Sequence, residues 1–203
     1  MIIKFLGTAA VNAYPEAFCR CDNCKRAREL GGPSLRKRSS VLINDDLLID
    51  LGPYIMTAAF MHDCTLTSVR YCLQTHPHAD HLDPSHFLSR SPAYGVVGAP
   101  LLHFYASAAT AQRTAQLLEI DFAPASLLDP EIGESLNLRI HQIEALQSFP
   151  VGPYNVTAFP ANDAACSLTT KRSLLTWPII KTSESITVFI DIHVTWLSFQ
   201  DRR

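Results

Sequence analysis

Three histidines and an aspartate lie within six positions in the segment Thr-His-Pro-His-Ala-Asp-His, directly after a short apolar run. We expect this segment to leave the end of a buried strand. His76 and His78 are two residues apart and, on an extended chain, point to the same side, where two neutral ring nitrogens can bind one cation. Asp80 and His81 follow at a turn and can face a second cation. Imidazole and carboxylate ligands together suit zinc, manganese or iron.

The alternative is a chance cluster of polar loop residues. His86 is a separate case, because it lies in the segment Asp-Pro-Ser-His-Phe-Leu, which is typical of the first turn of a helix with Pro84 at its start. We interpret His86 as a surface histidine.

A strand that ends in His-x-His-x-Asp-His resembles the signature of the metallo-β-lactamase superfamily. The earlier segment 48–52, Leu-Ile-Asp-Leu-Gly, resembles the superfamily strand that ends in an acidic residue and a glycine. The resemblance implies an α/β fold, the αββα sandwich with metals at one edge of the facing sheets, and we expect one such domain over residues 1–203. From its own residues Asp50 is equally a turn carboxylate. Beside metal-binding histidines it would accept a hydrogen bond from a ring N–H.

Cys19, Cys21 and Cys24, three of the six cysteines, stand together in the segment Cys-Arg-Cys-Asp-Asn-Cys. Three thiolates at this spacing suit a tetrahedral metal that needs one further ligand. The chain opens with an apolar stretch too short for export, so we expect a reducing compartment and no disulfide. Redox chemistry at Cys21 and Cys24 is the alternative to a structural metal.

The order of the motifs narrows the resemblance to one branch of the superfamily. An opening strand that runs into Gly7, the cysteine segment, a basic stretch ending Arg-Lys-Arg-Ser-Ser and a strand at 41–43 are similar to that branch. It contains the phosphoribosyl cyclic phosphodiesterases and a pyrroloquinoline quinone biosynthesis protein. In the former, the cysteines hold a structural zinc with a histidine from near the chain end. The resemblance therefore implies two divalent cations, Zn or Mn, at the histidine site and one structural Zn at the cysteines.

The later part of the chain departs from this pattern. Where the resemblance requires a third histidine the sequence has Asp163, which is either a zinc ligand or a surface aspartate. A β-branched segment ends at Asp191, in the place of the aspartate that bridges both metals, or as an ordinary strand-end aspartate. His193 is a candidate replacement at either site. We expect the closing elements of the family fold, with its last metal histidine, to be missing: either the chain is a shortened or frameshifted relative, or another element substitutes for them.

Composition limits the partners. With 203 residues, 47% hydrophobic, and a net charge of −2, the chain suffices for one cored domain and has no excess charge to recruit nucleic acid. No apolar stretch is long enough to span a bilayer, so we expect a cytoplasmic protein with no membrane partner and with a homodimer as a candidate assembly. Six of the seventeen basic residues lie between Lys25 and Arg38, opposed by Glu29 alone. They form a solvated face or, alternatively, Arg36, Lys37 or Arg38 steers an anionic substrate toward the metals.

The resemblance implies a metal-dependent hydrolase of small anionic phosphodiesters, cyclic phosphates in particular. His76 and His78 would hold one cation, and Asp80 and His81 a second about 3.5–4 Å away, with a bridging hydroxide as the nucleophile. Asp80 would also orient the hydroxide or pass a proton to the leaving alkoxide. Ester, thioester or lactam hydrolysis and a quinone-biosynthesis role are rivals. A catalytically inactive metal-binding or interaction protein is the rival outside enzymes.

Hydrophobic periodicity and turn residues predict the secondary structure. Asn-Asp-Asp at 44–46 predicts a hairpin turn, and Ser107 is a candidate helix cap. We expect strands at 2–6, 39–43, 47–50, 68–74, 136–145 and 154–160, and helices at 53–62, 84–90 and 107–119.

Overall fold

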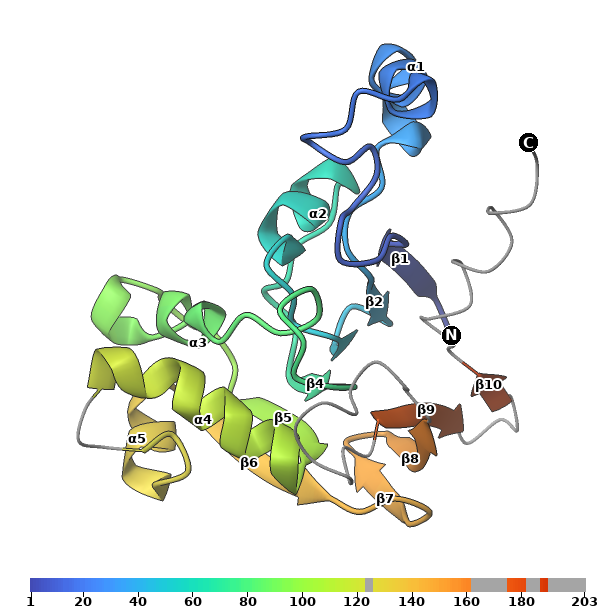
Figure 1. Ribbon diagram of the computed structural model, residues 1–203. Helices are drawn as coiled ribbons and strands as arrows, with labels where there is room; N and C mark the ends of the chain where they lie inside the picture. The colour runs from blue at the N-terminus through green and yellow to red at the C-terminus, as the bar shows by residue number, and fades with distance from the viewer. Residues whose placement is uncertain (123–125, 162–174, 182–186, 190–203) are drawn as a thin grey trace.

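The computed structural model describes residues 1–122, 126–161, 175–181 and 187–189. Within these residues the strands form two sheets, which Figure 1 shows one beside the other. The six-stranded sheet has the order β1 (Ile3–Gly7), β2 (Ser40–Ile43), β3 (Leu47–Ile49), β4 (Tyr71–Leu73), β5 (Leu102–Ser107) and β6 (Leu138–Ile143). The four-stranded sheet has the order β10 (Thr187–Phe189), β9 (Leu175–Lys181), β8 (Tyr154–Ala161) and β7 (Ser148–Val151).

The pairing of neighbouring strands changes once across the six-stranded sheet, from antiparallel to parallel. The pairs β1–β2 and β2–β3 are antiparallel, whereas β3–β4, β4–β5 and β5–β6 are parallel. The four-stranded sheet is antiparallel throughout. Because β3 and β4 are parallel, their carboxyl ends lie at the same edge, so the residues that follow Ile49 and Leu73 meet there.

The alternation of side chains along these strands separates two cores. Val41, Ile43, Leu47 and Ile49 are buried against the second sheet, together with Val156 of β8. The intervening residues face the helices, because successive strand side chains point to opposite faces. This second core contains Leu42, Leu48, Cys72 and Phe104 from the strands.

Helices cover the outer face of the six-stranded sheet (Figure 1). The helix-side core includes Ile55 and Ala58 of α2 (Ile55–Met61), Phe87 of α3 (Ser85–Ser89), and Ala111 and Ala115 of α4 (Ala108–Phe122). The described layers are therefore helix, sheet and sheet. The remaining helices are α1 (Asp22–Leu30), α5 (Pro130–Ser135) and the short 3₁₀ turns η1 (Gly32–Ser34) and η2 (Pro92–Tyr94).

The turn at 44–46 joins β2 to β3 as predicted. Asn44 and Asp45 have φ of 48° and 64°, a left-handed conformation that Asn and Asp adopt more readily than most residues. Asn44 and Asp46 also contact the hydroxyl of Tyr154, which ties the hairpin to the second sheet.

The secondary structure predicted from the sequence agrees with the structure in part. The predicted helices and strands are all present with shifted ends, and Ser107 Oγ accepts a bond from Thr110 N at 3.2 Å as the predicted cap. No helix was predicted for the segment that carries Cys24, which forms the start of helix α1. Strands β5, β7 and β9 and helix α5 were also not predicted. In the described part of the chain, no helix is long and apolar enough to cross a membrane.

Candidate metal centre

The histidine motif begins just beyond β4, at the sheet edge where β3 also ends. His76, Asp80 and His81 are buried there, and each offers one possible ligand atom within 4.8 Å of the other two. The ring centroids of His76 and His81 are 4.0 Å apart, and His81 Nε2 lies 3.4 Å from Asp80 Oδ2. Ligand atoms about 2.1 Å from a zinc ion are themselves about 3–4 Å apart. The donor set therefore fits a divalent cation.

His78 lies beside this set. Its ring makes an edge-to-face contact with His76, with centroids 4.7 Å apart and an interplanar angle of 80°. The three converging residues are nevertheless His76, Asp80 and His81. The assignment of His76 with His78 to one cation, and of Asp80 with His81 to another, stays a prediction.

Asp50 organises the motif from the end of β3. Its side chain is fully buried, and its Oδ2 lies 2.7 Å from His81 Nδ1. Its Oδ1 accepts bonds from Thr75 N at 2.8 Å, Thr75 Oγ1 at 2.7 Å and Gln74 Nε2 at 3.1 Å. This geometry matches the role expected of Asp50 beside metal-binding histidines, an acceptor for a ring N–H.

These bonds select the tautomers of two histidines. The carboxylate of Asp50 can only accept, so Nδ1 of the neutral His81 ring carries the proton and Nε2 is the nitrogen suited to a metal. Thr75 Oγ1 donates its single proton to Asp50 and therefore accepts from His76 Nδ1, 2.9 Å away. Nε2 of His76 then also presents a lone pair, which is the form that a metal ligand requires.

Gln74 is a buried residue of the site that the sequence analysis missed. Its Nε2 donates to the carbonyl oxygens of His76 at 2.9 Å and His81 at 3.1 Å, and its Oε1 accepts from Leu51 N at 3.2 Å. One amide thus ties the histidine loop to the turn after β3. The signal available in the sequence was a lone glutamine directly after an apolar strand.

The two loops approach so closely that one position requires glycine. A Cβ on Gly52 would lie 2.8 Å from the carbonyl oxygen of Asp80. Asp50 itself has a φ of 63°, which is unusual for a residue other than glycine. Backbone strain of this kind persists where surrounding bonds hold it, and the bonds to Asp50 do so.

Three competing effects act on the pKa of His81. Burial, the largest, lowers it; the carboxylates of Asp50 and Asp80 raise it, and Arg38 lowers it. Attraction to the two carboxylates prevails, so the pKa of His81 lies above its ordinary value. The negative charge of the two carboxylates therefore favours a bound cation, and a proton competes with a metal ion for the ring nitrogen of His81.

Arg38 connects the basic segment to the centre. Its Nη1 lies 3.4 Å from the carbonyl oxygen of Ala79, its Nε donates to Val11 O at 2.9 Å, and its guanidinium stands 5.0 Å from the ring centroid of Tyr54. No carboxylate in the described part of the chain pairs with it. Of the three basic residues considered from the sequence, Arg38 is the one with a contact to the histidine loop.

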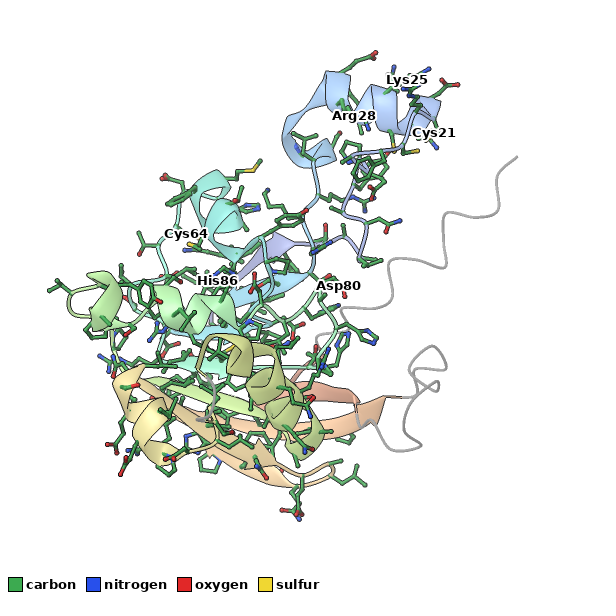
Figure 2. The ribbon with its side chains drawn as sticks, turned by 60° about the vertical axis from the view of Figure 1, so that its left-hand side comes forward. Cys21, Lys25, Arg28, Cys64, Asp80 and His86 are labelled. Carbon is green, nitrogen blue, oxygen red and sulfur yellow. The ribbon has the colours of Figure 1, made fainter. Side chains whose placement is uncertain are left out.

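The cysteines form a second possible metal group, and Figure 2 shows Cys21 far from Asp80, at the end of the molecule where α1 projects. The sulfur atoms of Cys19, Cys21 and Cys24 lie within 4.8 Å of one another, and those of Cys19 and Cys21 are 3.3 Å apart. Sulfurs on a tetrahedral zinc are separated by about 3.8 Å, since each Zn–S bond is about 2.3 Å. The three therefore fit one zinc ion with small shifts.

Local bonds favour thiolate at one of these cysteines. Bonds from the backbone N–H of Cys24 and from the Cys19 and Cys24 side chains lower the pKa of Cys21, which precedes helix α1. Burial raises the pKa of Cys24. Arg28 of α1 donates to the carbonyl oxygens of Glu16 at 2.6 Å and Cys19 at 2.8 Å, which closes the segment onto the helix.

The interpretation of His86 as a surface histidine is wrong. Its side chain is buried, and its Nε2 bonds to Gly52 O at 3.1 Å. The side chain faces inward because α3 packs on the sheet through the residues around it. Asp163, Asp191 and His193 lie outside the described residues, so their predicted roles stay predictions.

No protein-family model matches the sequence, and no curated protein matches it. Solved structures do. Zn²⁺-bound PqqB from Methylobacterium extorquens has a TM-score of 0.65 at 19% identity, over 89% of this chain and 62% of that chain. A diphosphatase from the PhnP family has a TM-score of 0.63 at 16% identity, over 88% and 61%. The metallo-β-lactamase fold protein YhfI from Bacillus subtilis has a TM-score of 0.53 at 14% identity, over 92% and 60%.

These likenesses show the fold. The chain has the metallo-β-lactamase fold, and the α/β sandwich predicted from the sequence is confirmed. The chain spans about three fifths of the length of each of these structures, with 62%, 61% and 60% of them covered.

Proposed function

We propose that this chain is a metal-dependent hydrolase of small anionic phosphodiesters. The observation that carries the proposal is the buried set of His76, Asp80 and His81 at the carboxyl ends of two parallel strands. Asp50 holds the tautomer of His81 directly and that of His76 through Thr75. Buried imidazole and carboxylate groups that converge in this way are the ligand types of divalent-cation sites.

Divalent cations in such a site supply a water of lowered pKa and a positive charge opposite the phosphoryl oxygens. His76, His78, Asp80 and His81 would hold them, with Zn or Mn as the ions that suit these ligands. Asp80 is the carboxylate of the set, so we assign it the further task of orienting the attacking water or moving a proton to the leaving oxygen.

The position of Arg38 favours a substrate that carries negative charge. It is a half-buried cation that contacts the loop through Ala79 and has no carboxylate partner among the described residues. A phosphodiester oxygen could accept a hydrogen bond from this guanidinium, which would help to hold the substrate beside the histidine loop. A neutral ester would gain nothing from it. The likeness to a diphosphatase from the PhnP family also favours cleavage at phosphorus.

The test is hydrolysis of bis(4-nitrophenyl) phosphate with added Mn²⁺ or Zn²⁺, in wild type and in the variant His78→Ala. We expect metal-dependent release of nitrophenolate that falls at least about 100-fold in the variant, since a metal ligand has been removed. His62→Ala is the matched control, because His62 is exposed and follows α2. Activity that persists unchanged in His78→Ala would show that the motif is not the catalyst.

A second candidate is a metal-binding protein without hydrolase activity, of the kind that a quinone-biosynthesis role would allow. The likeness to Zn²⁺-bound PqqB, at a TM-score of 0.65, agrees with the metal binding that both candidates require and is the reason to consider this role. The two candidates separate when metal binding and turnover are measured on one preparation. Bound metal without turnover of phosphodiesters, thioesters or lactams supports the second.

A further inference from the structure

A cavity of about 270 Å³ lies between the outer face of the six-stranded sheet and the helices that cover it. Its floor comes from Leu48, Cys72 and Leu102, which point to the helix side of β3, β4 and β5. Ile55 of α2 and the segment 96–100 close it from the other sides. His76, Asp80 and His81 do not line the cavity, so it is separate from the candidate metal centre.

Among the apolar residues that line the cavity there is one cationic side chain, that of Arg90. Arg90 follows α3 and lines the cavity, and its Nη2 donates to the carbonyl oxygen of Pro100 at 2.6 Å. Its guanidinium offers five N–H donors, but no carboxylate in the described ranges forms an ion pair with it. Burial lowers the pKa of Arg90, as expected for a charge that has lost water without gaining an anion.

The other polar groups that line the cavity, among the residues that the structure describes, supply no negative charge. His86 bonds to Gly52 O through Nε2, and Figure 2 shows it on the α3 side of the molecule, away from Asp80. The Asp83 carboxylate lies 3.9 Å from the same nitrogen but does not line the cavity. The thiol of Cys72 is fully buried, and burial raises its pKa far above neutrality, so it stays protonated. Among the described residues that line it, the cavity therefore combines aliphatic walls with one half-buried cation and no carboxylate. A partly desolvated cation without a counter-charge is costly, and an anionic ligand would relieve that cost.

We propose that this cavity is a binding site for a small apolar carboxylic acid, whose carboxylate pairs with Arg90 and whose hydrocarbon part packs on Leu48, Leu51 and Leu102. A cavity of about 150 Å³ holds benzene, with its six carbon atoms, so the present cavity suits a ligand of about ten non-hydrogen atoms. Octanoate has this size. The site is independent of the proposed hydrolase activity.

The experiment is calorimetric titration of the purified protein with octanoate and, as a neutral probe of equal length, 1-octanol. We expect octanoate to bind at least about tenfold tighter, because a desolvated guanidinium–carboxylate pair is stronger than a neutral contact. The variant Arg90→Met keeps the apolar stem and removes the charge, so it should bind both probes equally. Arg113→Met is the matched control, since Arg113 is an exposed residue of α4. The variant Arg113→Met should still bind octanoate more tightly than 1-octanol.

Two further variants keep the result interpretable. Ser89 is exposed at the edge of the cavity, so Ser89→Trp should block entry and abolish binding of both probes without a change in the core. His78→Ala, which disables the candidate metal centre, should leave octanoate binding unchanged. Equal binding of octanoate and octanol by the wild type, an unchanged preference in Arg90→Met, or loss of binding in His78→Ala would each overturn the proposal.

Discussion

Asp50 and His81 are 31 positions apart in the sequence, yet the Oδ2 of one lies 2.7 Å from the Nδ1 of the other, with both side chains buried. The contact exists because β3 and β4 are parallel neighbours, so the residues that follow them are brought to one edge. Asp50 also accepts from Thr75, whose hydroxyl reaches His76. One carboxylate thereby sets the orientation of two candidate metal ligands.

The variant Asp50→Asn should weaken metal binding about 10- to 100-fold, because its side-chain amide no longer offers a charged acceptor to His81 Nδ1–H. Competition with a chromogenic zinc chelator measures the affinity. Asp63→Asn is the matched control: Asp63 is an exposed residue in a turn, where Asn also tolerates the positive φ of 47°. Equal zinc affinity in Asp50→Asn and wild type would contradict the assigned role of Asp50.

Gln74→Leu should lower the free energy of unfolding by about 3 kcal/mol, since several buried groups lose their partner at once. These groups are Leu51 N and the carbonyl oxygens of His76 and His81. Urea denaturation of the metal-free protein measures the change. Gln112→Leu, on the exposed face of α4, is the control and should cost less than about 0.5 kcal/mol. A similar loss in both variants would show that the ties of Gln74 add no stability.

The sequence predicted the fold through its resemblance to a superfamily, and it pointed to the histidine segment whose side chains converge in the structure. His76, Asp80 and His81 are close in the chain, and alternation in short apolar runs placed β2, β3 and β4 around them. Asp50 was within reach because a superfamily resemblance pointed to it. Gln74 was not, because its role depends on bonds to three backbone groups that only the folded loops bring together.

The failures have physical causes as well. Helix α1 begins within the cysteine segment, where a polar sequence gave no apolar periodicity to detect. Strand β5 carries His103 and Tyr105 on the face toward the second sheet, so its pattern was not recognised as a buried strand. The inward orientation of His86 depends on how α3 packs, and local sequence does not determine that.

Arg38→Met should raise KM for an anionic phosphodiester about tenfold and leave kcat and the hydrolysis of a neutral aryl ester unchanged, because the guanidinium binds charge and takes no part in bond cleavage. Steady-state kinetics on both substrates measure the split. Arg36→Met is the matched control, since the Arg36 guanidinium stands over the ring of Tyr14, 4.8 Å from its centroid. An equal loss of kcat/KM on the neutral and the anionic substrate would mean that Arg38 only stabilises the histidine loop.

The paired histidines His103 and His141 should make stability depend on pH. Nδ1 of His103 lies 2.9 Å from Nε2 of His141, and the ring of His141 stacks on Tyr105 with centroids 4.5 Å apart. Burial, followed by positive charge that includes Arg139, lowers the pKa of both histidines. The folded state thus favours their neutral forms, and this stability is complete above the unfolded pKa of about 6.5.

As the pH falls below that value, the unfolded chain takes up protons first, so the free energy of unfolding decreases until the folded pKa is reached. Urea denaturation at pH 7.5 and 5.5 measures the decrease. The double variant His103→Gln/His141→Gln should lose less stability over this interval than the wild type, whereas the exposed-site control His62→Gln should match the wild type. An identical decrease in the double variant would contradict the prediction.

Metal content is the most direct test of the central claim, that His76, Asp80 and His81 bind a cation. Elemental analysis of dialysed protein should find three divalent cations per chain in the wild type, two at the histidine site and one at the cysteines. His76→Ala should retain the cysteine-bound zinc and lose metal at the histidine site, and Cys21→Ser should show the reverse. A single cation that is lost in Cys21→Ser and unaffected in His76→Ala would contradict the account.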